Sequence, residues 1–121
     1  MPDKNDHLQI VNKNFDFLDH TEKAIPPFEE WGATILFYIA IHYLEAYLDE
    51  CYGLHPRTHY KRLMILRNNT SMPSNIIRAY LTLYNRSREC RYQNIRLNNS
   101  DYQLLKTNTL DKIISFCQNF V

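Results

Sequence analysis

The sequence predicts an all-α fold, a four- to five-helix up-and-down bundle. Only two glycines and five prolines occur among the 121 residues, too few for the many turns that an all-β fold needs. Apolar residues instead recur at steps of three and four along most of the chain, which is the spacing of amphipathic helices. A chain of this length can bury one core, and we expect residues 1–121 to form a single domain.

Apolar spacing and helix breakers define the first two predicted helices. One apolar stripe predicts a helix over about residues 6–23, and Pro26-Pro27 ends it. The stripe consists of Leu8, Val11, Phe15 and Leu18. The second helix is expected to begin at Pro27 or Phe28 and to end at Gly53. Its apolar residues cover nearly the whole circumference, which predicts the central, most buried helix. They are Trp31, Ile35, Leu36, Phe37, Tyr38, Ile39, Ile41, Tyr43, Leu44, Tyr47 and Leu48.

Two further helices are predicted after Pro56. The third is short and covers about residues 57–67. The fourth covers about residues 73–92, and Ser71 or Ser74 can cap its start. Its core-facing stripe consists of Ile76, Tyr80, Leu83 and Tyr84.

A last helix follows the polar loop at residues 93–99. Ser100 and Gln103, three residues apart, predict a capping box at its start. Its apolar face consists of Tyr102, Leu105, Thr109, Ile113, Phe116, Cys117 and Phe120. This helix closes the bundle.

Charge is strongly segregated along the chain. Residues 55–96 hold all eight arginines and Lys61 with one acidic residue, Glu89, while the flanks hold five lysines and twelve acidic residues. A net charge of +1 hides this polarity. The pattern predicts either an anionic partner, such as phosphate, nucleic acid or an acidic protein surface, or pairing of the arginines with the acidic flanks on folding.

The apolar stripe of the fourth predicted helix continues as a polar one. At about 100° per residue, Ser87, Arg88 and Arg91 follow the direction of the stripe. Arg86 points into solvent instead. Arginines on a core-facing stripe need partners, because an unpaired buried charge costs several kcal/mol.

Two kinds of partner are possible for these arginines. The internal one is Glu45, which lies one turn from His42 on the second predicted helix. Glu45 and His42 would then form a structural polar network with the arginines. The external one is a bound anion.

A second polar cluster surrounds the start of the third predicted helix. His55, Arg57 and His59 are followed there by Lys61 and Arg62. Free N–H groups and cations at a helix start can bind an anion, and the histidines can also cap and pack locally. Because the histidines do not form a His-Glu-x-x-His arrangement, we expect no metal site. Neither glycine has phosphate-loop spacing and no nucleophile has a neighbouring base, so we predict no cofactor and no catalytic residue.

Three segments resemble the HEPN superfamily of small helical bundles. They are residues 31–46 (WGATILFYIAIHYLEA), 55–59 (HPRTH) and 84–92 (YNRSRECRY), and the resemblance spans about residues 7–92. It implies an all-α bundle that commonly forms homodimers in toxin–antitoxin, CRISPR and phage-defence systems. Active members of the family cut RNA without a metal, through an arginine followed after four to six residues by a histidine.

This chain lacks that ribonuclease motif. Its first arginine is Arg57 and its last histidine is His59, so no pair has the required spacing. Where the motif is expected, the chain has Ser87-Arg88 and Arg91-Tyr92. It therefore resembles the subgroup without the signature, because arginine alone can bind phosphate but cannot shuttle the proton that RNA cleavage requires.

Three functions follow as hypotheses. The first is a non-catalytic HEPN-like module that binds RNA or nucleotide phosphate in a defence or toxin–antitoxin type system. Its candidate binding residues are Arg88, Arg91, Ser87, Tyr92, His55, Arg57, His59 and Arg62. The second is a diverged metal-independent ribonuclease in which His42, His55 or His59 meets the arginines through the fold or a dimer. The third is a protein-interaction subunit, an antitoxin or adaptor for a partner encoded nearby.

The setting expected for all three is the cytoplasm. No apolar run is long enough for a membrane span, and the start of the chain lacks the order of a secretion signal. We expect a homodimer that does not associate with membranes.

Overall fold

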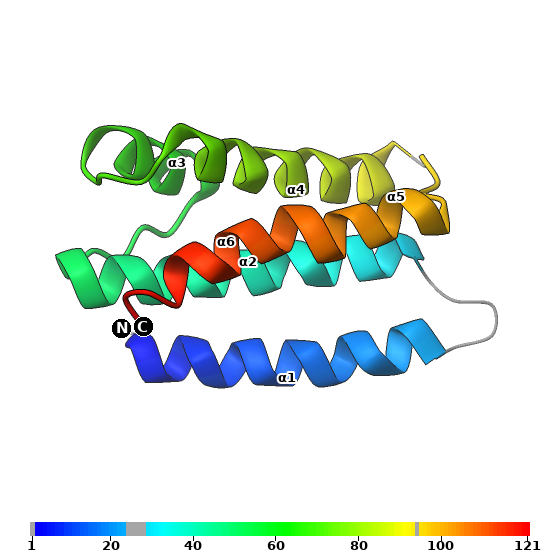
Figure 1. Ribbon diagram of the computed structural model, residues 1–121, viewed down its shortest axis with the longest axis horizontal. Helices are drawn as coiled ribbons and strands as arrows, with labels where there is room; N and C mark the ends of the chain where they lie inside the picture. The colour runs from blue at the N-terminus through cyan, green and yellow to red at the C-terminus, as the bar shows by residue number, and fades with distance from the viewer. Residues whose placement is uncertain (1, 24–28, 94) are drawn as a thin grey trace.

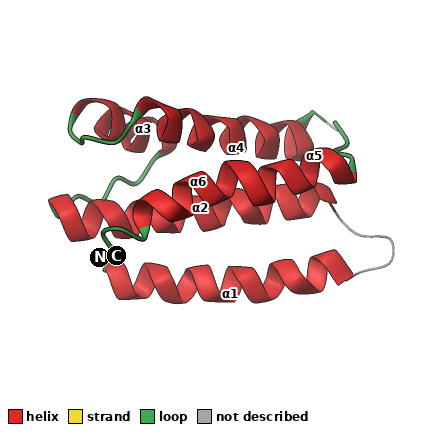
Figure 2. Cartoon of the chain, viewed as in Figure 1, coloured by secondary structure: helices red, strands yellow, loops and turns green. Residues whose placement is uncertain are grey.

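Helices make up nearly all of the structure, a computed structural model that describes residues 2–23, 29–93 and 95–121 (Figure 2). They are α1 (Lys4–Lys23), α2 (Glu29–Tyr52), α3 (His59–Asn68), α4 (Ser74–Tyr92), α5 (Asn99–Leu104), the π-helical segment η1 (Leu105–Leu110) and α6 (Asp111–Cys117). Because α5, η1 and α6 follow one another without a break, the described residues form five helices and no strand. The predicted all-α bundle is confirmed.

The centre of the bundle is α2 (Figure 1). It contacts α1, α4 and the continuous α5–η1–α6 helix, which also contacts α4. The long helices alternate in direction, and the short α3 lies beside the beginning of α4. Within the described ranges, no helix combines the length and the apolarity that crossing a membrane requires.

Most of α2 is buried, but one narrow strip is not. Trp31 is 59% exposed and Tyr38 is 41% exposed, so the prediction that they belong to the core is wrong. The two residues are seven apart and therefore share one face of the helix. The core residues of α2 with 0% exposure are Leu36, Ile39, Ala40, Leu44, Ala46 and Leu48.

Local hydrogen bonds set the helix boundaries. Gly53 ends α2 as predicted, with a left-handed φ of 63° and its N–H donating to the carbonyl of Asp49. Helix α3 begins later than predicted because Thr58 caps it, its Oγ1 accepting from the N–H of Lys61. The predicted start of α2 at Pro27 or Phe28 lies outside the described residues.

Two predicted caps are wrong. Helix α4 begins after Pro73, which provides no side-chain hydrogen bond, so neither Ser71 nor Ser74 caps it. The last helix is capped by Asn98, whose Oδ1 accepts from the N–H of Asp101 at 2.7 Å. Asparagine competes well for this position, which leaves Ser100 inside the first turn.

The last helix contains a π-helical turn that changes its buried face. Leu110 is 1% exposed, although α-helical spacing from Leu105 predicts Thr109 instead. A π turn holds more residues than an α turn, so the next inward position falls one residue later. Beyond the π turn the regular spacing resumes, and Ile113 and Cys117 are fully buried as predicted.

Candidate anion-binding site

The candidate anion-binding residues surround a buried ion pair between α2 and α3. Nε of Arg62 lies 2.7 Å from Oε1 of Glu45, and the two residues are only 7% and 5% exposed. The Thr58 cap fixes the start of α3 and so places Arg62 one turn later, against α2. The predicted pairing of Glu45 with Arg88 or Arg91 is wrong. Both arginines lie in the last turns of α4, whereas Glu45, in the second half of α2, contacts Arg62 on α3.

Tyr80 on α4 connects this ion pair to His59. Nη1 of Arg62 donates to the hydroxyl oxygen of Tyr80 over 3.2 Å, and the same oxygen lies 2.7 Å from Nδ1 of His59. Since Tyr80 is fully buried, its own proton needs an acceptor. Among the described residues, Nδ1 of His59 is the acceptor within reach. A neutral His59 therefore carries its proton on Nε2, on the opposite side of the ring.

The same network keeps His59 neutral. Burial lowers the pKa of His59 below its usual value, and the positive charges of Arg62 and Arg88 lower it further. A protonated ring would also donate from Nδ1, which would leave the Tyr80 hydroxyl without an acceptor. Burial raises the pKa of Tyr80, so its hydroxyl keeps the proton. His59 thus offers an uncharged N–H donor.

A line of rings and guanidinium groups extends from His59 along α4. The imidazole stacks on Tyr84, with ring centres 3.5 Å apart and planes 13° from parallel. The guanidinium carbon of Arg88 lies 5.6 Å from the ring centre of Tyr84 and 5.1 Å from that of Tyr92. Arg91 also lies 5.1 Å from the centre of the Tyr92 ring. Tyr84, Arg88 and Tyr92 meet because residues four apart are neighbours on a helix.

Arg91 connects this line to α2. Its guanidinium donates to the carbonyl and the hydroxyl of the buried Ser87, and its Nη1 lies 3.4 Å from the hydroxyl of Tyr38. Within the part of the chain that the structure describes, neither Arg88 nor Arg91 forms an ion pair with a carboxylate. We call this surface the arginine–tyrosine face. It consists of Tyr38, Tyr84, Arg88, Arg91 and Tyr92.

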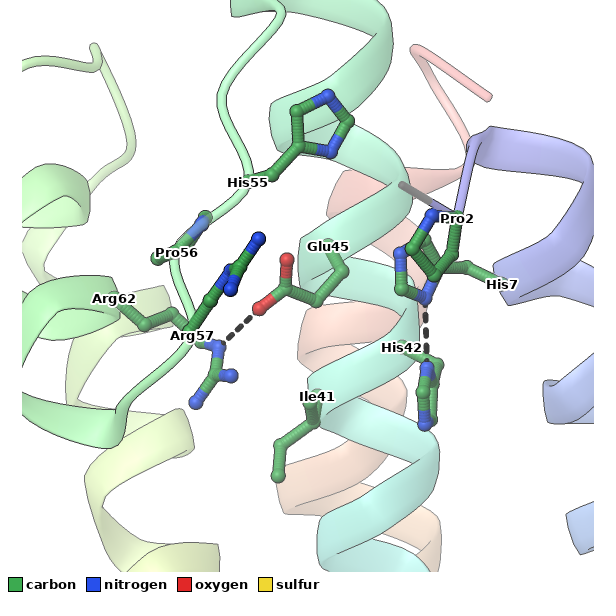
Figure 3. A pocket seen from close by; sticks show the side chains of 9 residues that line it. All are labelled: Pro2, His7, Ile41, His42, Glu45, His55, Pro56, Arg57 and Arg62. Carbon is green, nitrogen blue, oxygen red and sulfur yellow. Dashed lines mark hydrogen bonds and ion pairs between the residues drawn. The ribbon is translucent and has the colours of Figure 1, made fainter.

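The remaining predicted residues surround a separate pocket of about 360 Å³ beside the Glu45–Arg62 pair (Figure 3). Its polar lining consists of His7, His42, Glu45, His55, Arg57 and Arg62. The predicted set is therefore divided. His55, Arg57 and Arg62 lie at this pocket, whereas Ser87, Arg88, Arg91 and Tyr92 belong to the neighbourhood of the arginine–tyrosine face.

Histidines dominate one side of the pocket. Nδ1 of His7 lies 2.8 Å from Nδ1 of His42, so one ring donates and the other accepts. Burial lowers the pKa of both; that of His42 falls to about 4, with the charges of His7 and Arg62 also contributing. Nε2 of His55 lies 3.2 Å from Oδ1 of Asp49.

Four contributors to these sites are absent from the predicted set: His7, Tyr38, Tyr80 and Tyr84, the last two of which were predicted only as core residues of the fourth helix. His7 lies four residues before Val11, so a polar residue on the apolar stripe of α1 was the available signal. The sequence predicted Tyr80 only as a core residue. The available signal was that a buried tyrosine hydroxyl requires a hydrogen-bond partner. Nothing in the local sequence distinguishes Tyr38 from its buried neighbours on α2.

Comparisons with known proteins identify no family. The chain matches no protein-family model, and no curated protein or solved structure is significantly similar to it. Among the described residues, no group of three or more histidine, cysteine, aspartate or glutamate side chains could hold a metal ion. Function must therefore be inferred from the chemistry of the site itself.

Proposed function

We propose that this chain is a non-catalytic, HEPN-like module that binds RNA or nucleotide phosphate on the arginine–tyrosine face. One observation carries the proposal: Arg88 and Arg91, which have no carboxylate partner among the described residues, lie against accessible aromatic rings. Tyr92 is 67% exposed and Tyr38 is 41% exposed. An anionic ligand would supply the charge that the protein does not.

The chemistry of this surface favours a single strand over a duplex. Guanidinium groups bind phosphate through paired hydrogen bonds. Bases of a single strand can stack on aromatic side chains, each contributing about 1–3 kcal/mol, whereas bases in a duplex are already stacked. The alternation of Tyr84, Arg88 and Tyr92 along α4 offers both kinds of contact within two helical turns.

The protonation of His59 supports binding rather than cleavage. Metal-independent cleavage of RNA needs a base that accepts a proton from the attacking hydroxyl. Nε2 of His59 already carries a proton because Nδ1 accepts from Tyr80. The ring can therefore donate a hydrogen bond to a phosphate oxygen or a base edge next to Arg88.

The test is fluorescence anisotropy with a labelled ten-nucleotide single-stranded RNA at low salt. The Arg88→Ala, Arg91→Ala double variant should bind about tenfold or more weakly than the wild-type chain, because it loses two phosphate contacts. An Arg88→Lys, Arg91→Lys variant should fall between the two, since lysine keeps the charge but not the planar fork. A duplex of the same length should bind less tightly than the single strand.

The matched control is Arg67→Ala, Arg86→Ala. It removes the same charge from α3 and α4, but Arg67 is exposed elsewhere and Arg86 pairs with Glu89 at 3.3 Å. Circular dichroism verifies that each variant is folded. Equal losses of RNA affinity in the two double variants would mean that removing positive charge weakens binding wherever the charge lies on the chain. No RNA affinity in the wild-type chain would reject the proposal and favour a protein-interaction subunit, which co-purification with a neighbour-encoded partner would identify.

A diverged metal-independent ribonuclease is the second candidate. The position of His59 beside the proposed phosphate contacts favours it, but the ring would act as a base only in its other tautomer, with Nε2 unprotonated. The assay is cleavage of labelled RNA in the presence of EDTA, with His59→Ala as the test and the exposed His20→Ala as the control. Cleavage that is lost only in His59→Ala supports this candidate; intact RNA after incubation with the wild-type chain rejects it.

The biological setting forms part of the same proposal. A cytoplasmic homodimer in a defence or toxin–antitoxin type system is what the HEPN resemblance implies for such a module. Analytical ultracentrifugation with and without RNA tests the dimer, and a monomer under both conditions would remove that part of the proposal.

A further inference from the structure

We propose that the pocket beside the Glu45–Arg62 pair is a second binding site, for a small organic anion with an oxyanion group on an apolar body. Figure 3 shows Arg57 and Arg62 on one side of Glu45, and His7 with His42 on the other. None of these residues belongs to the arginine–tyrosine face. The proposal is therefore independent of RNA binding.

The dimensions and walls suit a small molecule. A volume of about 360 Å³ lies within the range of about 300–1,000 Å³ that is typical of ligand sites. Pro2, Ile41 and Pro56 contribute apolar surface to the lining. An inorganic ion alone would leave that surface in contact with water, so we infer an apolar body attached to the anionic group.

The charged groups at the pocket favour an anion. Two guanidinium groups, of Arg57 and Arg62, line the pocket with one carboxylate, that of Glu45. Oε1 of Glu45 is already bound by Nε of Arg62 at 2.7 Å. Arg57 extends toward the same carboxylate in Figure 3. An oxyanion at this position would lie beside both guanidinium groups, and Nε and Nη1 of Arg62 already donate to Glu45 and Tyr80.

Asp49 does not line the pocket, and both of its carboxylate oxygens have other partners. Oδ2 of Asp49 accepts the backbone N–H of Lys4 at 2.8 Å, while Oδ1 faces Nε2 of His55 at 3.2 Å. Both oxygens are therefore directed to existing partners.

The His7–His42 pair adds polar groups without adding charge. One proton lies between the two Nδ1 atoms, so one ring has a free Nε2 acceptor and the other has an Nε2–H donor. The assignment can exchange between the rings. The pair can therefore donate to an oxyanion or accept from a hydroxyl on the ligand, depending on which tautomer is present.

The test is an NMR titration of the full ¹⁵N-labelled chain with three probes that share one apolar body: benzoate, phenyl phosphate and benzyl alcohol. We expect saturable shifts at Ile41, His42, Glu45 and Arg57 with at least one acid, and about tenfold weaker binding of the alcohol. Comparison of the two acids distinguishes a carboxylate ligand from a phosphate ester. Inorganic phosphate should bind more weakly than phenyl phosphate because it lacks the body.

Two variants test the site in different ways. Arg57→Ala removes one cation, and Ile41→Phe narrows the pocket without changing charge; each should weaken binding of the acid about fivefold or more. Arg67→Ala, which removes the same charge from an exposed position on α3, should not. Arg88→Ala, Arg91→Ala should also retain acid binding, which separates this site from the RNA proposal. The inference is overturned if no probe gives saturable shifts, if the alcohol binds as tightly as the acids, or if the shifts lie at the arginine–tyrosine face.

Discussion

At the scale of single residues, the hydroxyl of Tyr80 has the largest structural consequence. Tyr80→Phe keeps the ring and its packing but leaves Nη1 of Arg62 and Nδ1 of His59 without their common partner. We expect the free energy of unfolding to fall by about 1–3 kcal/mol, the cost of buried polar groups that lose a hydrogen bond. Urea denaturation measures the change.

A second tyrosine-to-phenylalanine variant tests whether losing any hydroxyl has the same effect on stability as losing that of Tyr80. Tyr60 is 70% exposed on α3, so Tyr60→Phe should change the free energy of unfolding by less than about 0.5 kcal/mol. Imidazole ¹⁵N shifts provide an independent check, because the wild-type ring should be protonated on Nε2. Equal stability of the two variants would contradict the hydrogen-bond assignment.

Acid should destabilise the chain through its buried histidines. The pKa of His42 is about 4 in the folded chain, against an ordinary value of 6.5. Between these values the unfolded chain binds more protons, so the free energy of unfolding decreases as the pH falls from about 6.5 to 4. His7 and His59, whose pKa values are also lowered by burial, act in the same direction.

His42→Gln tests this pH dependence. Glutamine can keep a hydrogen bond to His7 but cannot titrate, so the decrease in stability between about pH 6.5 and 4 should be smaller than in the wild-type chain. Other groups that face this pair, Glu45, Asp49 and Arg62, are unchanged in the variant. His20→Gln, at an exposed position, serves as the control. Identical pH profiles for all three chains would contradict the prediction.

Most residues of the two candidate sites could be predicted from the sequence, but their grouping could not. Clustered charge on predicted helices was sufficient to select Arg62, Arg88 and Arg91. The partners of these arginines depend on how the chain folds back after Gly53 and where it places α3 against α2. No local sequence pattern predicts that placement. Glu45 consequently pairs with Arg62, and the predicted binding residues separate into two sites.

At the scale of helices, Gly32 allows the last helix to approach α2. A Cβ at this position would lie 2.7 Å from Cε1 of Tyr102, whose hydroxyl donates to Glu22 on α1. Alanine gains about 1 kcal/mol in helix propensity, but a ring that is held at its far end cannot yield easily, and overpacking costs about 1–3 kcal/mol. We expect Gly32→Ala to lower the free energy of unfolding by up to about 2 kcal/mol, the difference between these two contributions.

A double-mutant cycle separates these two contributions. In a Tyr102→Leu background the clash disappears, and Gly32→Ala should become neutral or stabilising. Urea denaturation of the four chains gives the coupling. A coupling energy near zero would show that Gly32 has no role in the contact with Tyr102.

The π turn in the last helix should tolerate the loss of one residue. Deleting the exposed Asn108 would bring Leu105, Leu110 and Ile113 to regular α-helical spacing on the same face. We expect the free energy of unfolding to stay within about 1 kcal/mol of wild type. Deleting the exposed Thr82 from α4 should be far more damaging, because it would rotate buried Leu83 out of the core. Equal losses in the two deletions would contradict this account of the π turn.

The presence of the helices could be predicted better than their boundaries. The 3.6-residue periodicity of apolar positions indicated α1, α4 and the last helix, whereas a continuous apolar run and the helix breakers around it indicated α2, and Pro56 indicated α3. The start of a helix depends on which of several neighbouring polar side chains accepts the hydrogen bond at the N-cap, as Thr58 and Asn98 do. The phase of the last helix could not be predicted after Leu105, because the π turn changes the number of residues per turn.

At the scale of the whole molecule, few of the ion pairs that the structure describes join the basic segment to the acidic flanks. Among the described residues, Lys4, Lys23 and Lys106 pair with carboxylates of the flanks. Arg86 pairs within the basic segment with Glu89. The buried Arg62–Glu45 pair joins the two regions. Segregation of charge in the sequence therefore persists in the folded chain at Arg88 and Arg91.

Salt should consequently affect binding far more than folding. If two phosphates contact Arg88 and Arg91, RNA affinity should fall about 25-fold between 50 and 500 mM NaCl, since each contact to a single strand contributes a logarithmic slope of about −0.7. Exposed ion pairs contribute at most about 1 kcal/mol each, so the free energy of unfolding should change by less than about 1 kcal/mol over the same range. Anisotropy and urea denaturation in matched buffers measure both quantities. A large loss of stability with little effect on RNA affinity would mean that the arginines act mainly in pairing with the acidic flanks, and the binding proposal would fail.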